Sequence, residues 1–227
     1  KINSGSWKWA KQIGGQSKSL GLDGGLVFTG SDLVFAGQSW PCTSDSTKQI
    51  VIGSTTINNM NNSHYVEFFG TLSTSGTWGS VRWTGGSTNA FMGNTKISPH
   101  PSGVMLSGLY KATSYDTNFS TVSFADDEGP WIGTILLNGS TLNLINSEII
   151  SVSSGSNMDG KGTLSMSNNV SMTAYMNDYN DYFNLSGDET QVYDDSALIV
   201  SKVNNTYVSA AVIQADQMYT SGGYLRI

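Results

Sequence analysis

Short runs in which apolar and polar residues alternate occupy much of the chain. The clearest of these runs are residues 25–29, 32–36, 64–70, 77–83, 131–137, 141–152, 162–166, 171–176, 198–203 and 207–213. A period of two residues, with many β-branched and aromatic side chains, predicts β-strands. No long run has the apolar spacing of three to four residues that marks an amphipathic helix. The pattern therefore predicts an all-β protein.

Three residue pairs between these runs are typical of tight hairpins. They are Asn138–Gly139, Asp159–Gly160 and Asn204–Asn205. Asn, Asp and Gly tolerate the positive φ that two-residue hairpin loops require. We therefore expect an antiparallel strand pair on either side of each one.

The composition changes near residue 126, at the acidic turn Asp126–Pro130. Most of the tryptophans, both histidines and the single cysteine precede this turn, whereas most of the tyrosines follow it. A polar segment that ends in Gly-Pro is a plausible domain boundary. We therefore expect an irregular, aromatic-rich ligand-binding domain over residues 1–125 and a regular antiparallel barrel or sandwich over 126–227. One continuous sandwich is the alternative.

The chain is poor in charge. Asp, Glu, Lys and Arg make up 12% of the 227 residues, about half of the ~25% in an average soluble domain. The net charge is −6, and no cluster of Lys and Arg suits a nucleic acid or an anionic membrane. The apolar runs have strand length, which argues against a membrane-spanning helix. The single cysteine, Cys42, excludes an internal disulfide, and the richness in Ser, Thr, Asn and Gly is typical of extracellular β proteins.

The two histidines are the most informative candidates for a binding site. His64 stands where a polar segment meets the run 64–70, and His100 lies between Pro99 and Pro101. The prolines argue against a helix or a central strand and predict a rigid loop that presents His100. Two histidines and one cysteine are too few ligands for structural zinc. Haem needs only one or two axial ligands in an apolar, aromatic pocket, so the ligand count favours haem.

Aromatic residues are frequent between the two histidines, as a haem pocket requires. Strict strand alternation over 77–83 places Val81 and Trp83 on one face and Trp78 on the other. The alternative is that these aromatics are ordinary core residues and that both histidines are surface or hydrogen-bonding residues.

The layout resembles the secreted haemophores of the hemophilin type and, more distantly, the surface lipoproteins of the transferrin-binding protein B family. The features that match are the chain length, the split near Asp126, the segment Ser98–Pro101 and the regular strands from Trp131 onward. The resemblance implies an N-terminal clamp or handle domain that holds haem, followed by an eight-stranded β barrel. It also implies secretion by a Gram-negative bacterium.

The function that this resemblance implies is capture of haem and its delivery for iron acquisition, without enzymatic activity. The partners would be haem, host haemoglobin and an outer-membrane haem receptor, and we expect a monomer. The expected axial ligands of the iron are His64 and His100; the alternative is that one of them binds the iron and the other lies next to the ligand without binding it. The side chains expected to pack the porphyrin are Phe69, Trp78, Trp83 and Tyr110, and Lys96 is expected to pair with a propionate.

Two other functions remain open. A β-jelly-roll glycosidase needs two carboxylates across the scissile bond, and Glu67 and Glu148 are the candidates, although Glu67 is expected to be exposed and Glu148 to mark an edge. The stretch 175–195 mixes tyrosines with aspartates and suits a carbohydrate- or protein-binding surface or, through the aspartates, Ca²⁺.

Overall fold

The computed structural model describes residues 2–3, 5–15, 19–40, 49–57, 66–84, 92–110, 114–116, 121–123, 131–151, 159–166, 170–177, 181–185, 188–192, 196–203, 206–214, 219–221 and 224–226. Within these ranges the chain forms strands, turns and extended segments, and none of them contains a helix. The all-β prediction is therefore confirmed. It follows that, over the same ranges, no helix is long and apolar enough to cross a membrane.

The strands follow one another in this order: β1 (Ile2–Asn3), β2 (Ser6–Trp7), β3 (Ile13–Gly15), β4 (Ser19–Phe28), β5 (Asp32–Trp40), β6 (Ile50–Ile52), β7 (Thr55–Ile57), β8 (Val66–Ser73), β9 (Trp78–Thr84), β10 (Met92–His100), β11 (Gly103–Tyr110), β12 (Ser114–Asp116), β13 (Thr121–Ser123), β14 (Trp131–Leu137), β15 (Leu144–Ser151), β16 (Asp159–Met166), β17 (Val170–Asn177), β18 (Asp181–Leu185), β19 (Asp188–Val192), β20 (Ser196–Val203), β21 (Thr206–Gln214), β22 (Tyr219–Ser221) and β23 (Tyr224–Arg226). All pairings described between them are antiparallel. Each run predicted as a strand overlaps one of them.

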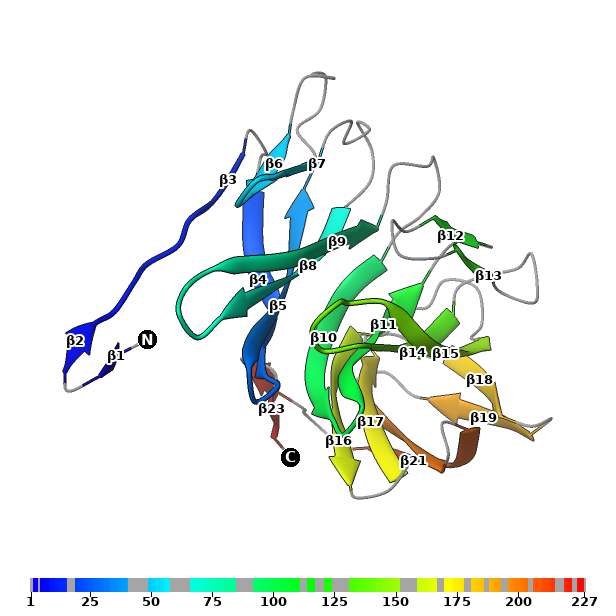
Figure 1. The fold of residues 1–227 in the computed structure, drawn as a ribbon. Coiled ribbons are helices and arrows are strands. Elements are labelled where there is room, and N and C mark those ends of the chain that lie inside the picture. Colours follow the sequence, from blue (N-terminus) through cyan, green and yellow to red (C-terminus); the bar gives the residue numbers. More distant parts are fainter. Residues whose placement is uncertain are drawn as a thin grey trace.

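The central sheet consists of β4, β5, β8 and β9 in that order, and it is covered on both faces (Figure 1). On one face, Phe35 and Phe68 pack with the isoleucines of β6 and β7. On the other face, Val34 and Phe69 pack with residues of β10, β11 and β14. A strand that is buried on both faces needs small or apolar side chains at successive positions. This explains the nearly continuous apolar composition of β8, which is buried from Val66 to Leu72.

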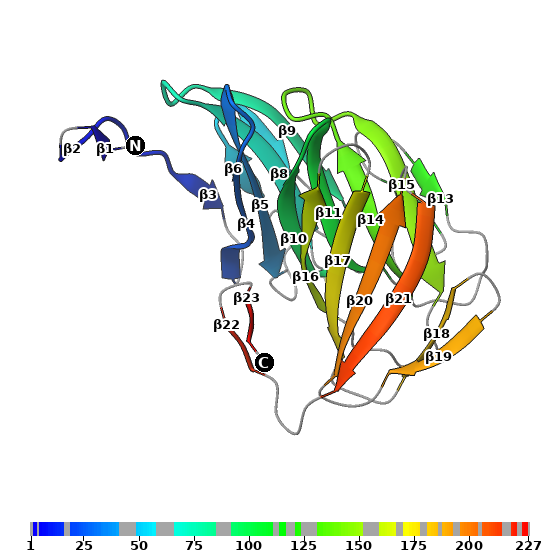
Figure 2. The same cartoon turned by 90° about the horizontal axis from the view of Figure 1, so that it is seen from below.

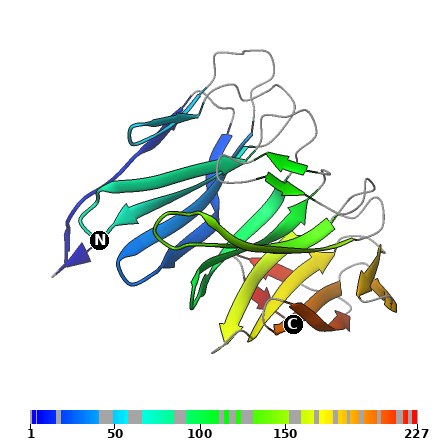
Figure 3. The same cartoon turned by 45° about the vertical axis from the view of Figure 1, so that its right-hand side comes forward.

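Two further four-stranded sheets follow the central one. The second sheet has the order β10-β11-β14-β15, and the third has the order β16-β17-β20-β21. Strand β10 lies against β4 on one side and against β16 on the other (Figures 1 and 2). Figure 3 shows the strands of residues 19–84 (blue to cyan) gathered on one side and those from residue 92 onward (green to orange) on the other.

The hairpin predictions have three different outcomes. Asn138–Gly139 lies in the turn between β14 and β15, so this prediction is confirmed. Asn204–Asn205 lies outside the described residues, but the flanking strands pair as a hairpin through Val203 and Thr206. Asp159–Gly160 was wrongly predicted to be a turn. It lies at the start of β16, where the β16–β17 register is irregular between Gly160 and Gly162. Such a bulge accommodates residues that are otherwise typical of turns.

Trp78 was predicted to face away from Val81 and Trp83, and this prediction is wrong. All three side chains pack in the cluster that contains Phe35 and Phe68. The register of β8 with β9 shifts between Gly70, which pairs with Val81, and Leu72, which pairs with Trp78. The irregularity breaks strict alternation and brings Trp78 to the same face as its neighbours.

The segment around His100 is a strand end and a hairpin rather than the loop that the prolines predicted. Pro99 and His100 are the last residues of β10, and they pair with Val104 and Gly103 of β11. Among the described pairings, β10 is an edge strand with β11 as its one partner. Pro99 is the last residue but one of β10, so its missing N–H removes one backbone donor close to the end of the strand.

The expected domain boundary at residues 125 and 126 lies outside the described residues. The pairing of β11 with β14 joins strands from both sides of this boundary in one sheet, from Val104 opposite Leu137 to Tyr110 opposite Trp131. The division into residues 1–125 and 126–227 stays a prediction.

Candidate functional site

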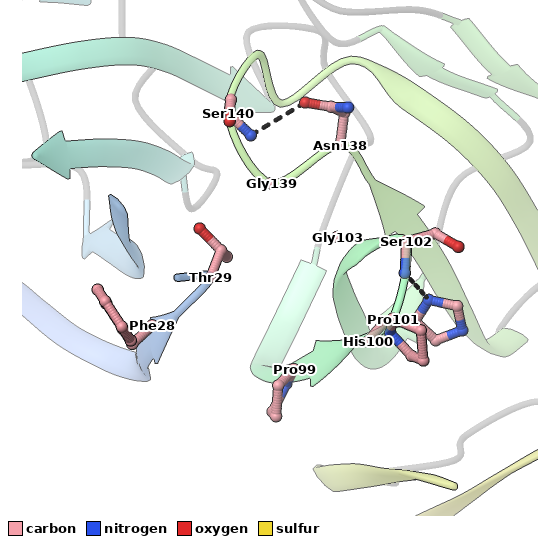
Figure 4. A pocket seen from close by; sticks show the side chains of 10 residues that line it. All are labelled: Phe28, Thr29, Pro99, His100, Pro101, Ser102, Gly103, Asn138, Gly139 and Ser140. Atoms are coloured by element: carbon pink, nitrogen blue, oxygen red, sulfur yellow. Dashed lines mark hydrogen bonds between the residues drawn. The ribbon is translucent and has the colours of Figure 1, made fainter. Parts of the chain in front are cut away.

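Three hairpin turns enclose a pocket of about 360 Å³ (Figure 4). Its lining comes from Phe28–Thr29 at the end of β4, from Pro99–Gly103 between β10 and β11, and from Asn138–Ser140 between β14 and β15. Thr29 lies next to Gly139, and the Phe28 side chain points away from the other two turns. His100 is the predicted site residue that belongs to this pocket.

The β10–β11 turn is tight because of Gly103. The pair His100–Gly103 closes the hairpin around Pro101 and Ser102. Gly103 has a φ of 151°, and a Cβ at this position would collide with the carbonyl oxygen of Leu137 on β14. Glycine adopts such a conformation without steric cost. The turn therefore lies directly against β14.

The β14–β15 turn is held by a network centred on Asn138. Its Oδ1 accepts hydrogen bonds from the N–H groups of Ser140 at 3.0 Å and Thr141 at 2.9 Å. Its backbone accepts from the N–H of Leu142 and donates to the carbonyl of Asn143, each at 2.9 Å. A side chain of Asn that bonds its own following backbone is a stable turn device.

This turn also contacts the central sheet. Arg82 of β9 donates from Nη2 to Oδ1 of Asn143 at 3.2 Å. A Cβ placed on Gly139 would lie 3.1 Å from Cγ2 of Thr29, so the β4–β5 and β14–β15 turns are in close contact. Leu142 is fully buried in the core that the central and second sheets share. These contacts fix two of the three turns relative to each other.

The hydrogen bond from Ser102 to His100 indicates which ring nitrogen of this imidazole carries the proton. The N–H of Ser102 donates to Nδ1 of His100 at 3.1 Å. In the neutral ring, a nitrogen that accepts carries no proton, so the proton is on Nε2. A histidine that ligates iron through Nε2 has its proton on Nδ1 and donates from there. Ligation by His100 would therefore require the bond to Ser102 to break.

The other predicted site residues lie in different layers. Phe69 is 1% exposed and packs between the central and second sheets. Trp78 and Trp83 are half-buried on the opposite face of the central sheet. Lys96 is on β10 next to Ile97, and alternation places it on the face of the second sheet away from the shared core. The structure therefore does not gather these four residues around one ligand.

Tyr110 and His64 cannot be placed in this way. Tyr110 is the last residue of β11, but its side chain lies outside the described part of the structure, as does all of His64. Val66, two residues after His64, begins β8 opposite Ser39, whereas Ser73 ends β8 opposite Asp32. The β4–β5 turn beside His100 therefore lies at the other end of β8 from Val66.

Several buried polar groups were not found from the sequence. Lys96 pairs with Ser107, which pairs with Thr134, so a polar row crosses three strands of the second sheet. Ser107 and Thr134 are buried. Glu67 is 3% exposed, so the expectation of an exposed carboxylate there is wrong. It belongs to β8, which neighbours cover on both faces. A polar residue in an alternating strand gives no sign of which face a later strand will cover.

A metal site does not emerge from the part of the chain that the structure describes. No three His, Cys, Asp or Glu side chains in it come together as ligands. Most of the aspartates of the stretch 175–195 lie outside this part, and so does Cys42.

Comparison of the chain with protein-family models, with curated proteins and with solved structures finds no match. The function is therefore argued from the residues and their geometry.

Proposed function

We propose that this protein binds haem through a single histidine, His64, which comes two residues before β8, and that the end of the central sheet where β8 begins and β9 ends forms part of the pocket. The observation that carries the proposal is the register of these two strands, in which Phe68 pairs with Trp83 and Glu67 pairs with Thr84. Trp83 is therefore near the start of β8, which begins two residues after His64 in the chain, and it is half-buried on the sheet face. Haem needs one or two axial ligands in an apolar, aromatic pocket, and Trp83 is suited to form one wall of it.

The geometry of His100 supports a single axial ligand. Its Nδ1 accepts a hydrogen bond from Ser102, so the ring proton is on Nε2. Ligation through Nε2 requires the proton to be on Nδ1 instead. His100 also lies beside the β4–β5 turn, at the far end of β8 from Val66. Eight residues of strand span about 25 Å. Two axial nitrogens on one iron are far closer than that, so the proposal uses His64 alone.

Capture and delivery of haem by a secreted bacterial protein remains the biological role that we propose, with host haemoglobin as source and an outer-membrane receptor as recipient. The burial of Glu67 counts against the glycosidase alternative. A catalytic carboxylate must reach the glycosidic bond, whereas Glu67 is covered by neighbouring strands.

We further propose that the second and third sheets join as an eight-stranded barrel. The supporting contact is that between β10 and β16, which are the edge strands of the two sheets. The strand order would then be β15-β14-β11-β10-β16-β17-β20-β21. Strand β18 contacts both β15 and β21, the two strands at the ends of this order. Such a barrel begins at Met92, so the N-terminal domain would end between Thr84 and Met92 rather than at residue 125.

Titration with haemin tests the proposed ligand. We expect the wild-type protein to give a Soret band that is lost in His64→Ala and kept in His100→Ala, because only the former removes the axial nitrogen. Loss of the band in both single variants would show that both histidines ligate. A wild-type protein without any spectral change would refute the haem proposal.

Trp83 and Trp78 provide a matched pair for the porphyrin wall. Both are half-buried on the same face of the central sheet, but Trp83 pairs near the start of β8 and Trp78 pairs with Leu72 near its end. We expect Trp83→Leu to weaken haemin binding and Trp78→Leu to leave it unchanged. The thermal unfolding of both variants serves as the control for folding. Equal weakening in the two variants would contradict the proposed position.

A further inference from the structure

Strand β9 is an open edge of the central sheet, and we propose that it binds an extended peptide segment with a carboxylate opposite Arg82. The inference does not depend on the proposed haem site. Strand β9 pairs with β8 on one side and, among the described pairings, with no strand on the other (Figure 1). Backbone N–H and C=O groups that point to such an open side can bond to one additional strand.

The sequence of β9 leaves this edge open to pairing. The strand, Trp78–Thr84, contains no proline and no lysine, which commonly protect edge strands from pairing. Its register with β8 is irregular near Trp78 but regular from Val81, opposite Gly70, to Thr84, opposite Glu67. Regular pairing on one side keeps the backbone groups on the other side in register for a further strand. The stretch around Arg82 therefore has the geometry that an added strand requires.

Arg82 indicates the charge of the partner. Its side chain is half-buried, its Nη2 donates to Oδ1 of Asn143 at 3.2 Å, and its Nη1 lies 3.5 Å from the carbonyl oxygen of Val81. Its Nε is buried without an acceptor. Among the residues that the structure describes, no carboxylate pairs with this guanidinium, and Glu67 lies opposite Thr84 rather than opposite Arg82. A half-buried guanidinium without an opposite charge is stabilised by an anionic partner.

A carboxylate on the added strand, directly opposite Arg82, would be within reach of the guanidinium. Cross-strand neighbours have Cβ atoms about 4.5–5.5 Å apart. An arginine side chain has several N–H donors, and Nη1 and Nη2 each have one contact with a protein acceptor, so donors remain for a carboxylate. A second copy of β9 suits this edge less well. It has no carboxylate, and pairing about Arg82 would bring two guanidinium groups together. The edge therefore favours an acidic segment.

The test is a titration of the full-length ¹⁵N-labelled protein with the acetylated and amidated peptides STVEVTS, STVQVTS and STVKVTS, followed through the backbone amides of β9. We expect STVEVTS to shift the amides from Val81 to Thr84 with a dissociation constant of about 1 mM. The other two peptides should bind at least ~fivefold more weakly, because they lack the carboxylate. N-methylation of STVEVTS at alternate positions blocks one peptide edge, so one of the two possible patterns should abolish binding.

Arg82→Gln and Lys11→Gln are the matched variants. Both remove one positive charge, but Lys11 is exposed in the segment before β3 and lies outside β9. Arg82→Gln should weaken the binding of STVEVTS about fivefold, to the level of STVQVTS. Lys11→Gln should leave it unchanged. Thermal unfolding of both variants serves as the control for folding.

The proposal is overturned if no peptide shifts the β9 amides at ~10 mM, well above the expected constant. It is also overturned if STVQVTS binds as tightly as STVEVTS, or if the two variants weaken binding equally, since either result would exclude a specific contact with Arg82. Sedimentation tests the remaining occupant of the edge. Dimers of the wild-type protein that shift the same amides would assign the edge to a second copy and would contradict the proposal.

Discussion

Leu142 combines a left-handed backbone with complete burial. It has a φ of 57°, and its side chain is 0% exposed in the core between the central and second sheets. A residue with a Cβ pays about 1–2 kcal/mol for the left-handed conformation. Burial of a leucine side chain contributes about 1.5–3 kcal/mol. The core contact therefore offsets the backbone strain and fixes the shape of the β14–β15 turn.

Substitutions at Leu142 should give an unusual order of stability. Leu142→Ala removes the core contact but keeps the strain, so it should lower the free energy of unfolding by about 2–4 kcal/mol. Leu142→Gly removes both and should be more stable than the alanine variant by about 1 kcal/mol. Urea denaturation measures both changes. An alanine variant more stable than the glycine variant would contradict the strained conformation.

At the scale of elements, hairpin turns bring together residues that are far apart in the sequence. The pocket takes its lining from three such turns. Gly103 makes the tight β10–β11 turn possible, and Asn138 stabilises the β14–β15 turn. The residue pairs that predict turns can be recognised in the sequence. Whether three turns come together depends on which strands end at the same end of neighbouring sheets, and the tertiary structure decides this.

Alanine substitutions at Gly30 and Gly103 distinguish the cost of backbone strain from the cost of steric overlap. Gly30 has a φ of 94° with no atom near its Cβ position, whereas a Cβ on Gly103 would overlap Leu137. Gly30→Ala should therefore cost about 1 kcal/mol from strain alone. Gly103→Ala should cost about 2 kcal/mol more, since β11 and β14 would have to separate. The two free energies of unfolding from urea titrations test this, and equal losses would contradict the overlap.

The sequence predicted strands best where alternation was regular. The predicted run 131–137 coincides with β14, whereas β10 was missed entirely. Strand β10 contains Pro99, and its register with β11 is irregular between Gly93 and Lys96. Both features break the period of two residues on which the prediction depends.

At the scale of the whole molecule, β10 connects the three large sheets, since it pairs with β11 and lies against both β4 and β16. The core shared by the central and second sheets makes them one packed unit. Whether the second and third sheets also form a barrel depends on the two edges of β10.

Hydrogen exchange distinguishes an eight-stranded barrel from two open sheets. In a barrel, both edges of β10 are paired, so successive amides from Lys96 to Ser98 should exchange slowly. In an open sheet, alternate amides face solvent and should exchange fast. Strand β9 is an edge strand of the central sheet in the described pairings, and its amides serve as the internal standard for an open edge. An alternating pattern in β10 like that in β9 would refute the barrel.

The sequence by itself determined the all-β class, most of the long strands and the Asn138–Gly139 turn, because these follow from local periodicity and from φ preferences. Only the tertiary structure decided which faces are buried. In the tertiary structure Glu67 is buried, Phe69 lies in a core, Trp78 and Trp83 share one face of the central sheet, and His100 lines a pocket with the β4–β5 turn. The physical reason is that burial depends on the layers stacked above and below a strand, and nonlocal partners of the chain supply those layers.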